Sequence, residues 1–257
     1  MQWEKINVCV QKWMKQARKI ILEGRTKELC VEEKTSRCDL VTNVDKFIEK
    51  FYVDRIRETF PNSKILGEEG EADKDLDNFK GLLWIIDPID GTMNFVKQHD
   101  HFASMIAVCE NGIEKLGYIL DVTEDKLYWG GPECGVFCND QKVEPPKNLP
   151  LEEGLFGVGG KMLLSNYRNV QSAAKKSLGV RIYGSSGIEF IHVLTGKNVS
   201  YLSHLRPWDY AAGKILAEAL GLVVKTIDEE SLDMLSSSDV LVATKNAHQG
   251  IVKLMNS

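Results

Sequence analysis

Two aspartates, Asp87 and Asp90, stand three residues apart at the end of an apolar run in a chain of 257 residues. The run is typical of a buried strand. Pro88 is expected to end that strand and turn the chain, because proline has no N–H to donate. Gly91 permits a tight backbone, and Thr92 is expected to cap a following helix. Such a turn offers carboxylates to a divalent cation and backbone N–H groups to an anion.

Three further acids stand near predicted ends of strands and helices. Glu68 follows a short strand and lies between glycines, while Asp45 follows Thr42 in a pattern that resembles a capping box. Asp209 comes directly after Pro-Trp, where a helix is expected to begin and a carboxylate is favoured electrostatically. Each acid alone has an ordinary explanation: a solvated bend for Glu68, and a helix cap for the two aspartates.

As a group, Glu68, Asp87, Asp90 and Asp209 predict a cation site. Carboxylates gathered at one place repel one another unless cations lie between them. A set of oxygen ligands favours Mg²⁺, Mn²⁺ or Ca²⁺ over zinc. Two such ions about 4 Å apart are the usual arrangement for in-line attack on a phosphoryl group.

The predicted helices and strands that must position these acids are arranged differently in the first and second halves of the chain. The first half combines two amphipathic helices, at 6–21 and 44–60, with strands at 64–66 and 82–86. An antiparallel meander follows, with strands at 102–109, 113–120, 127–129 and 135–138. Residues 33–42 are expected to form a polar loop. The second half alternates strands at 151–158, 180–183, 199–202, 222–226 and 240–243 with helices at 162–178, 188–194, 208–220 and 249–255. A proline-rich stretch separates halves 1–146 and 147–257, and the pattern predicts a mixed α/β (α+β) fold.

The composition and net charge of the chain argue against some classes of binding partner. The chain is 43% hydrophobic and carries a formal net charge of −5, which argues against a nucleic-acid partner, because phosphate backbones demand a basic face. It contains no apolar run of membrane-spanning length, and its charged first residues do not resemble a signal peptide, so we expect a cytoplasmic protein without a membrane partner. The six cysteines form no C-x-x-C pair and favour reduced thiols over a zinc site.

Four motifs resemble the signatures of the inositol monophosphatase family, in the order and at the spacing of that family. They are G-E-E at 67–69, W-I-I-D-P-I-D-G-T-x-N-F at 84–95, W-D-x-A-x-G at 208–213 and D-L-V-T-x-x-D at 39–45. The resemblance covers nearly the whole chain. It implies an αβαβα layered fold and the hydrolysis of phosphate monoesters of the inositol-1-phosphate type by direct attack of water. It also implies two or three Mg²⁺ ions, for which Mn²⁺ could substitute, and a homodimer.

The resemblance assigns a role to each matching residue. The implied metal ligands are Glu68, Asp87, the Ile89 carbonyl, Asp90 and Asp209. The implied catalytic residues, which would activate the attacking water, are Asp45, Thr92 and Glu68. The implied substrate-binding residues are Asp90, Gly91, Thr92, Gly184, Ser185 and Asp209. Lys34 and Asp39 match loop positions near the site, and Glu69 lies beside the metal ligands.

One position departs from the family pattern. In inositol-specific members a glutamate seven residues before the Trp-Asp aspartate contacts substrate hydroxyls, and Leu202 stands at that distance from Asp209. Leucine cannot accept those hydrogen bonds, a loss worth about 1–3 kcal/mol. A broader substrate range therefore stays open, including fructose 1,6-bisphosphate and the 2′-phosphate of NADP. Two interpretations of another class also stay open: a non-catalytic metal or ligand sensor, and a structural protein whose acids only cap helices.

Overall fold

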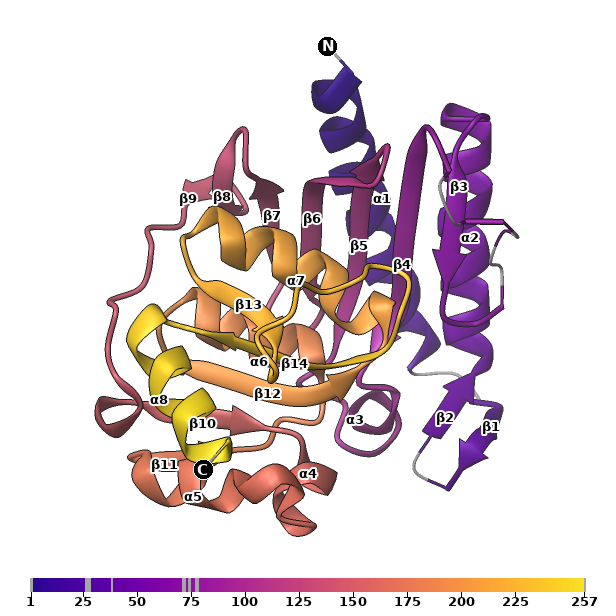
Figure 1. The fold of residues 1–257 in the computed structure, drawn as a ribbon. Helices are drawn as coiled ribbons and strands as arrows, with labels where there is room; N and C mark the ends of the chain where they lie inside the picture. Colours follow the sequence, from indigo (N-terminus) through magenta and orange to yellow (C-terminus); the bar gives the residue numbers. More distant parts are fainter. Residues whose placement is uncertain are drawn as a thin grey trace.

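The computed structural model describes residues 2–25, 29–37, 39–70, 73, 75–76 and 79–256 (Figure 1). Two helices, α1 (Gln2–Gly24) and α2 (Asn43–Thr59), form its first layer. The apolar residues of α1 recur at helical spacing, and those on the inner face are buried against α2 and a large sheet. Both predicted N-terminal helices are therefore confirmed.

The second layer is a seven-stranded sheet in the order β3-β4-β5-β6-β7-β8-β9. Its strands are β3 (Lys64–Gly67), β4 (Leu82–Asp90), β5 (Ala103–Glu110), β6 (Ile113–Asp121), β7 (Lys126–Gly131), β8 (Gly135–Cys138) and β9 (Gln141–Lys142). Only β3 and β4 run parallel, and the remaining neighbours form the predicted antiparallel meander. Nearly all of β5 is buried because helices cover both faces of the sheet.

Two helices, α6 (Ser186–Leu194) and α7 (Pro207–Ala219), form the central layer between the sheets (Figure 1). They bury apolar side chains against β4 and β5 on one side and against β12 (Ser200–Leu205) on the other. The helices also pack closely on each other, since a Cβ at Gly213 would lie 2.3 Å from the Phe190 ring. Elements of the second half therefore contact the first sheet directly.

The fourth layer is a five-stranded sheet in the order β11-β10-β12-β14-β13. Its other strands are β10 (Leu155–Val158), β11 (Gly179–Arg181), β13 (Val223–Thr226) and β14 (Ser238–Ala243). The outer layer consists of η1 (Leu151–Glu153), α4 (Gly160–Leu164), η2 (Tyr167–Asn169), α5 (Val170–Lys176) and α8 (Lys245–Met255). This alternation of helices and sheets confirms the expected mixed αβαβα fold. The boundary between halves 1–146 and 147–257 stays a prediction.

Two local predictions were wrong. The expected polar loop is a two-stranded hairpin, β1 (Val31–Ser36) with β2 (Asp39–Thr42), which lacks an apolar face and so gives no strand pattern in the sequence. The expected helix at 162–178 is broken into α4, η2 and α5. Asn166, Arg168 and Asn169 adopt left-handed backbone conformations there, which asparagine tolerates better than most residues.

The described part of the chain has neither a membrane-spanning helix nor a disulfide bond. None of its helices is long and apolar enough to cross a membrane. Its cysteines, at positions 9, 30, 109, 134 and 138, are free thiols, and Cys38 lies outside the described residues.

Candidate active site

Three of the predicted acids meet where β4 ends and α7 begins. Asp87, Asp90 and Asp209 each offer a carboxylate oxygen, and these oxygens all lie within 4.8 Å of one another. A cavity of about 180 Å³ opens beside them. Its lining also includes other residues predicted for the site: Glu68, Ile89, Gly91, Thr92 and Gly184. The fold thus brings together groups from positions 68 to 209.

The turn after Asp87 differs from the prediction. Strand β4 continues through Pro88 to Asp90, and its pairing shifts so that the three-residue step from Asp87 to Asp90 faces a two-residue step on β5. A β-bulge of this kind accommodates a proline that cannot donate to the ladder. Gly91, with a φ of 87°, precedes α3 (Thr92–Lys97) as its N-cap.

Thr92 does not cap α3, contrary to expectation. Its hydroxyl lies 3.0 Å from Asp45 Oδ1 and 3.1 Å from the Ile89 carbonyl oxygen, and can donate to either. Asp45 also accepts from the Thr42 hydroxyl and, at 2.9 Å, from the Thr42 backbone N–H. The Thr42 side-chain oxygen in turn accepts from the Asp45 backbone N–H at 3.4 Å, which completes the predicted capping box. Burial raises the pKa of Asp45 to about 6, although these hydrogen bonds oppose the shift. Asp45 is thus both a member of the capping box of α2 and a buried carboxylate in contact with Thr92, which lines the cavity.

Asp90 joins the two halves of the chain. Its Oδ1 accepts from the Ser186 backbone N–H at 3.0 Å and hydroxyl at 2.9 Å, and its Oδ2 accepts from the Gly187 N–H at 2.8 Å and from the Ser185 hydroxyl. These donors lie at the N-terminus of α6, where a carboxylate is favoured. Burial raises the pKa of Asp90 and the donors lower it. The four hydrogen bonds fix this carboxylate in place.

Asp87 is held differently. It is 1% exposed, and its Oδ1 has no hydrogen-bond partner among the described residues. Burial, followed by the charges of Glu68, Asp90 and Asp209, raises its pKa well above the ordinary value. An orphaned carboxylate oxygen in a cluster of acids fits a hard divalent cation, which would supply the missing partner and the opposing charge.

Asp209 is the third residue of α7 and not its N-cap. Its carboxylate accepts from the Arg206 backbone N–H at 2.8 Å. Burial, Asp90 and Glu68 raise its pKa to about 8. Asp209 therefore adds a second carboxylate whose ionisation the surrounding acids oppose, as expected where a cation is to bind.

Glu68 and Glu69 follow β3 and are not a solvated bend. Lys34, on the β1–β2 hairpin, lies 2.9 Å from Glu68 Oε1 and 2.7 Å from Glu69 Oε1. Burial lowers the pKa of Lys34, but the two carboxylates outweigh that effect and raise it. Sequence reasoning placed Lys34 near the site without predicting this pairing. The side chain of Asp39 lies outside the described residues.

Leu202, seven residues before Asp209, lines neither cavity beside the acids, as expected for a residue that offers no hydrogen bond to a substrate. Its side chain is fully buried in the core between the second sheet and the outer helices. Its neighbours Tyr201 and Ser203 line a second cavity, of about 380 Å³, that shares Asp90, Gly184 and Asp209 with the first. Successive strand residues point to opposite faces, so Leu202 points away from the face that carries Tyr201 and Ser203. Ser185 also lines this second cavity.

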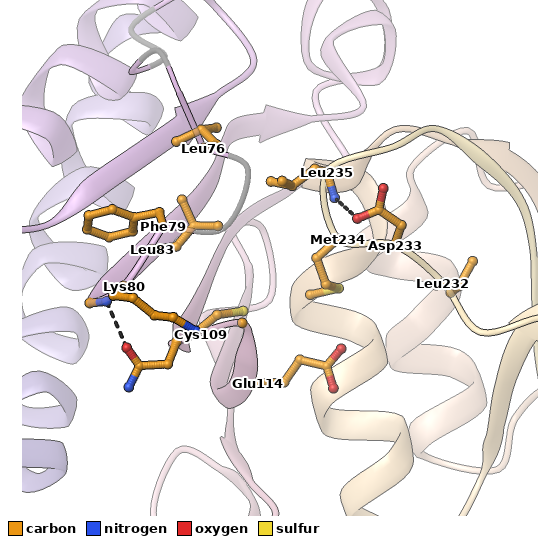
Figure 2. Close-up of a pocket in the computed structure, with 13 residues that line it drawn as sticks. Leu76, Phe79, Lys80, Leu83, Cys109, Glu114, Leu232, Asp233, Met234 and Leu235 are labelled. Atoms are coloured by element: carbon orange, nitrogen blue, oxygen red, sulfur yellow. Dashed lines mark hydrogen bonds between the residues drawn. The ribbon is translucent and has the colours of Figure 1, made fainter.

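A further cavity, of about 340 Å³, lies between the two halves away from the acids (Figure 2). Leu83, Cys109 and Glu114 face the loop that carries Leu232 and Met234 across it. The Glu114 carboxylate is paired with Lys214 Nζ at 2.7 Å. None of the residues predicted for the site lines this cavity, which separates it from the acidic cluster.

Comparisons with known proteins agree with this architecture. The sequence model of the "Inositol monophosphatase family" matches residues 2–257. An inositol-1-monophosphatase of Bacillus subtilis is 40% identical over 254 residues, which cover 97% of this chain and 96% of that protein. A fructose-1,6-bisphosphatase/inositol-1-monophosphatase of Thermotoga maritima is 30% identical and covers 88% of this chain and 86% of that protein.

Solved structures give the same result. A staphylococcal IMPase-I complexed with products superposes with a TM-score of 0.91 at 32% identity, covering 99% of this chain and 96% of that one. An IMPase/NADP phosphatase complexed with Mg²⁺ and phosphate gives a TM-score of 0.91 at 31% identity, covering 100% and 97%. By its sequence over nearly its whole length, and by its fold, this chain belongs to the inositol monophosphatase family.

Proposed function

We propose that this protein hydrolyses phosphate monoesters of the inositol-1-phosphate type in a Mg²⁺-dependent reaction. The observation that carries the proposal is the convergence of Asp87, Asp90 and Asp209, with oxygens within 4.8 Å of one another, beside a cavity lined by Gly91 and Thr92. Unaided hydrolysis of such esters is among the slowest reactions known, so the site must stabilise a highly charged transition state.

The carboxylates of Glu68, Asp87, Asp90 and Asp209, with the carbonyl of Ile89, would hold two or three Mg²⁺ ions, or Mn²⁺ in their place. When bound, these ions supply positive charge to the phosphoryl oxygens and acidify water. The orphaned Asp87 Oδ1 and the raised pKa values of Asp87 and Asp209 support this assignment.

The chain's own groups would orient the reactants. The Thr92 hydroxyl donates to Asp45, so its oxygen can take a proton from the attacking water while its own proton passes to the carboxylate. The backbone N–H groups of Gly91 and Thr92 would donate to phosphate oxygens. Glu68, which lines the same cavity, would help to orient the water. No protein nucleophile takes part, so no phosphoenzyme is expected.

The leaving alcohol would occupy the second cavity, beside Gly184 and Ser185. Its volume of about 380 Å³ favours a second candidate function, a broader phosphatase that also acts on NADP 2′-phosphate or fructose 1,6-bisphosphate. Ser203, which faces that cavity, is smaller than a glutamate and leaves room for larger leaving groups.

Phosphate release from inositol 1-phosphate, fructose 1,6-bisphosphate and NADP, with and without Mg²⁺, tests both candidates. We expect turnover only with Mg²⁺ and its loss in Asp209→Asn. Asp54→Asn, an exposed aspartate of α2, serves as the matched control and should retain turnover. Mg²⁺ binding without hydrolysis of any monoester would instead identify a metal or ligand sensor.

We also infer that two copies of the chain pair through β11, an edge strand of the second sheet. Leu178 and Ile182 flank this strand and are 70% and 53% exposed, and Leu164 nearby is 86% exposed. Analytical ultracentrifugation should give a dimer that Leu178→Glu dissociates, while Ile113→Glu, at an exposed position of the other sheet, leaves it intact. A monomeric wild type would refute the pairing. A cytoplasmic location stays a prediction from sequence.

A further inference from the structure

Glu49, on the inner face of α2, is a fully buried carboxylate that none of the family motifs includes. Its neighbours Ile48 and Tyr52 belong to the core that α2 forms with the large sheet. A carboxylate buried among apolar side chains costs free energy unless hydrogen-bond donors contact it. The groups that Glu49 contacts therefore indicate why a charged residue stands at this position.

Glu49 contacts the backbone on both sides of Glu68. Its Oε2 accepts a hydrogen bond from the Glu69 backbone N–H at 2.8 Å. On the other side, a Cβ at Gly67 would lie 2.5 Å from the same oxygen, so a side chain at that position would displace the carboxylate. The glycine before Glu68 and the N–H after it thus define the place that the Glu49 carboxylate occupies.

The β-ladder does not hold the loop that carries Glu68 and Glu69. Strand β3 is at the edge of its sheet, and its last residue, Gly67, pairs with the residue of β4 that precedes Asp87. Glu68 follows directly and lines the acidic cavity beside Asp87. Because β3 ends at Gly67, the backbone of the loop takes its support from other groups, of which the Glu49 carboxylate is one.

The contact with Glu49 differs from the ion pairs made by Lys34. The Lys34 ammonium binds the carboxylates of Glu68 and Glu69, so a cation that uses Glu68 competes with it. Glu49 binds the backbone instead, so its contact can persist while the Glu68 carboxylate binds a cation. The backbone contact is therefore the one that can order the loop in the cation-bound protein.

Helix α2 contacts the site at a second point. Asp45 lies one turn before Glu49 on the same face of the helix, and both residues are fully buried. The hydroxyl of Thr92, which lines the acidic cavity, lies 3.0 Å from Asp45 Oδ1. A single helix thus contacts both Thr92 and the loop that carries Glu68, which fixes the two relative to each other.

We propose that Glu49 is a positioning residue, which holds the backbone at 67–69 in the conformation that presents Glu68 to the acidic cavity. The inference rests on the proposed function, because it takes Glu68 as a ligand of the divalent cation. A ligand that is already oriented loses less freedom when the cation binds, so Glu49 should strengthen cation binding without taking part in the reaction itself.

Calorimetric titration with Mg²⁺ in the absence of substrate tests the assignment. Glu49→Leu, which removes the acceptor, should bind Mg²⁺ about tenfold more weakly than the wild type, since partners that orient metal ligands contribute about 10–100-fold to affinity. Glu49→Gln, which keeps a carbonyl oxygen for the Glu69 N–H, should recover most of the affinity. Gly67→Ala should also weaken binding, because its methyl group would displace the Glu49 carboxylate, and it tests the same contact if Glu49→Leu does not fold.

Phosphate release from inositol 1-phosphate gives a second measurement. Glu49→Leu should need about tenfold more Mg²⁺ for half-maximal turnover, while kcat at saturating Mg²⁺ stays near the wild-type value. Val53→Ala is the matched control: this buried residue lies one turn further along α2, so the variant should lower the urea midpoint and leave the Mg²⁺ affinity unchanged.

Three results would overturn the role of Glu49: an unchanged Mg²⁺ affinity in Glu49→Leu, an affinity in Glu49→Gln as weak as in Glu49→Leu, or an equal loss in Val53→Ala. The last would show that any destabilisation of α2 weakens the site. A wild type that neither binds Mg²⁺ nor hydrolyses a monoester would overturn the proposed function, and this inference with it.

Discussion

Replacing Thr92 by valine tests the route of the proton from water to Asp45. The substitution keeps the shape of the side chain and removes the hydroxyl that lies 3.0 Å from Asp45 Oδ1. Asp45 is fully buried and keeps only its two hydrogen bonds from Thr42. Losing a hydrogen bond to a charged group should lower the free energy of unfolding by about 1.5–3 kcal/mol.

The effect on turnover should be larger and should distinguish the two threonines. General acid–base groups contribute about 10²–10⁴-fold to rates, so kcat of Thr92→Val should fall by about that factor. Thr42→Val is the matched control: it also removes a hydroxyl from Asp45 and a helix cap, so it should destabilise the protein at least as much. Because it leaves the Thr92–Asp45 contact intact, it should retain most of its turnover. Thr92→Ser should keep part of the activity.

The pH dependence of turnover should follow the ionisation of Asp45. The carboxylate is the form that accepts a proton, so turnover should fall as the pH drops through the Asp45 pKa of about 6. Hydrogen bonds from Thr42 and Thr92 lower that pKa, so both valine variants should move the acidic limb of the kcat/KM profile to higher pH. Phosphate-release assays and urea unfolding measure the two quantities. The reasoning fails if Thr92→Val hydrolyses inositol 1-phosphate at the wild-type rate, or if Thr42→Val loses as much turnover.

Three further predictions follow from buried groups. Asp87→Asn should abolish Mg²⁺ binding, as measured by calorimetry. It should also raise the melting temperature of the Mg²⁺-free protein, because burial and three neighbouring acids oppose the charge of Asp87. A lower melting temperature would contradict this reasoning. Burial raises the pKa of Glu189 from 4.5 to about 8, so its contribution to stability is complete below pH 4.5 and is lost as the pH rises through 8. The urea midpoint of the Mg²⁺-free protein should therefore fall between pH 5 and pH 8, less steeply in Glu189→Gln; equal slopes would refute the assignment. Gly213→Ala would place a Cβ 2.3 Å from the Phe190 ring and should cost about 1–3 kcal/mol in urea unfolding, and an unchanged midpoint would show that α6 and α7 can separate there.

The sequence identified the acids because they belong to local patterns. The segments around Asp87, Asp90 and Asp209 combine apolar runs with proline and glycine at fixed spacing. Such patterns can be recognised without knowing which distant segments pair in the fold. The long helices α1 and α2 were predictable for the same reason, since their apolar residues repeat at helical spacing. The family and the fold class followed from these local features, and the same features predict magnesium rather than zinc.

Other features depend on pairing between distant segments, which no local pattern encodes. The register of β4 against β5 allows the strand to continue through Pro88, where proline alone predicted a stop. The face of β12 that meets the cavity was decided by which sheet face packs on the outer helices, so Leu202 is buried and Ser203 is not.

The partners of the polar side chains were also decided by the tertiary structure. Asp90 is bound by the N-terminus of α6, almost a hundred residues away in sequence, and Lys34 reaches two glutamates from a separate hairpin. His204 meets Asp239 only because β12 and β14 are neighbours. Sequence by itself determined which residues can do the chemistry, because residue type and short spacing are local properties. The tertiary structure decided which groups hold them and which face the substrate, because strand register and helix packing arise only when the whole chain is folded.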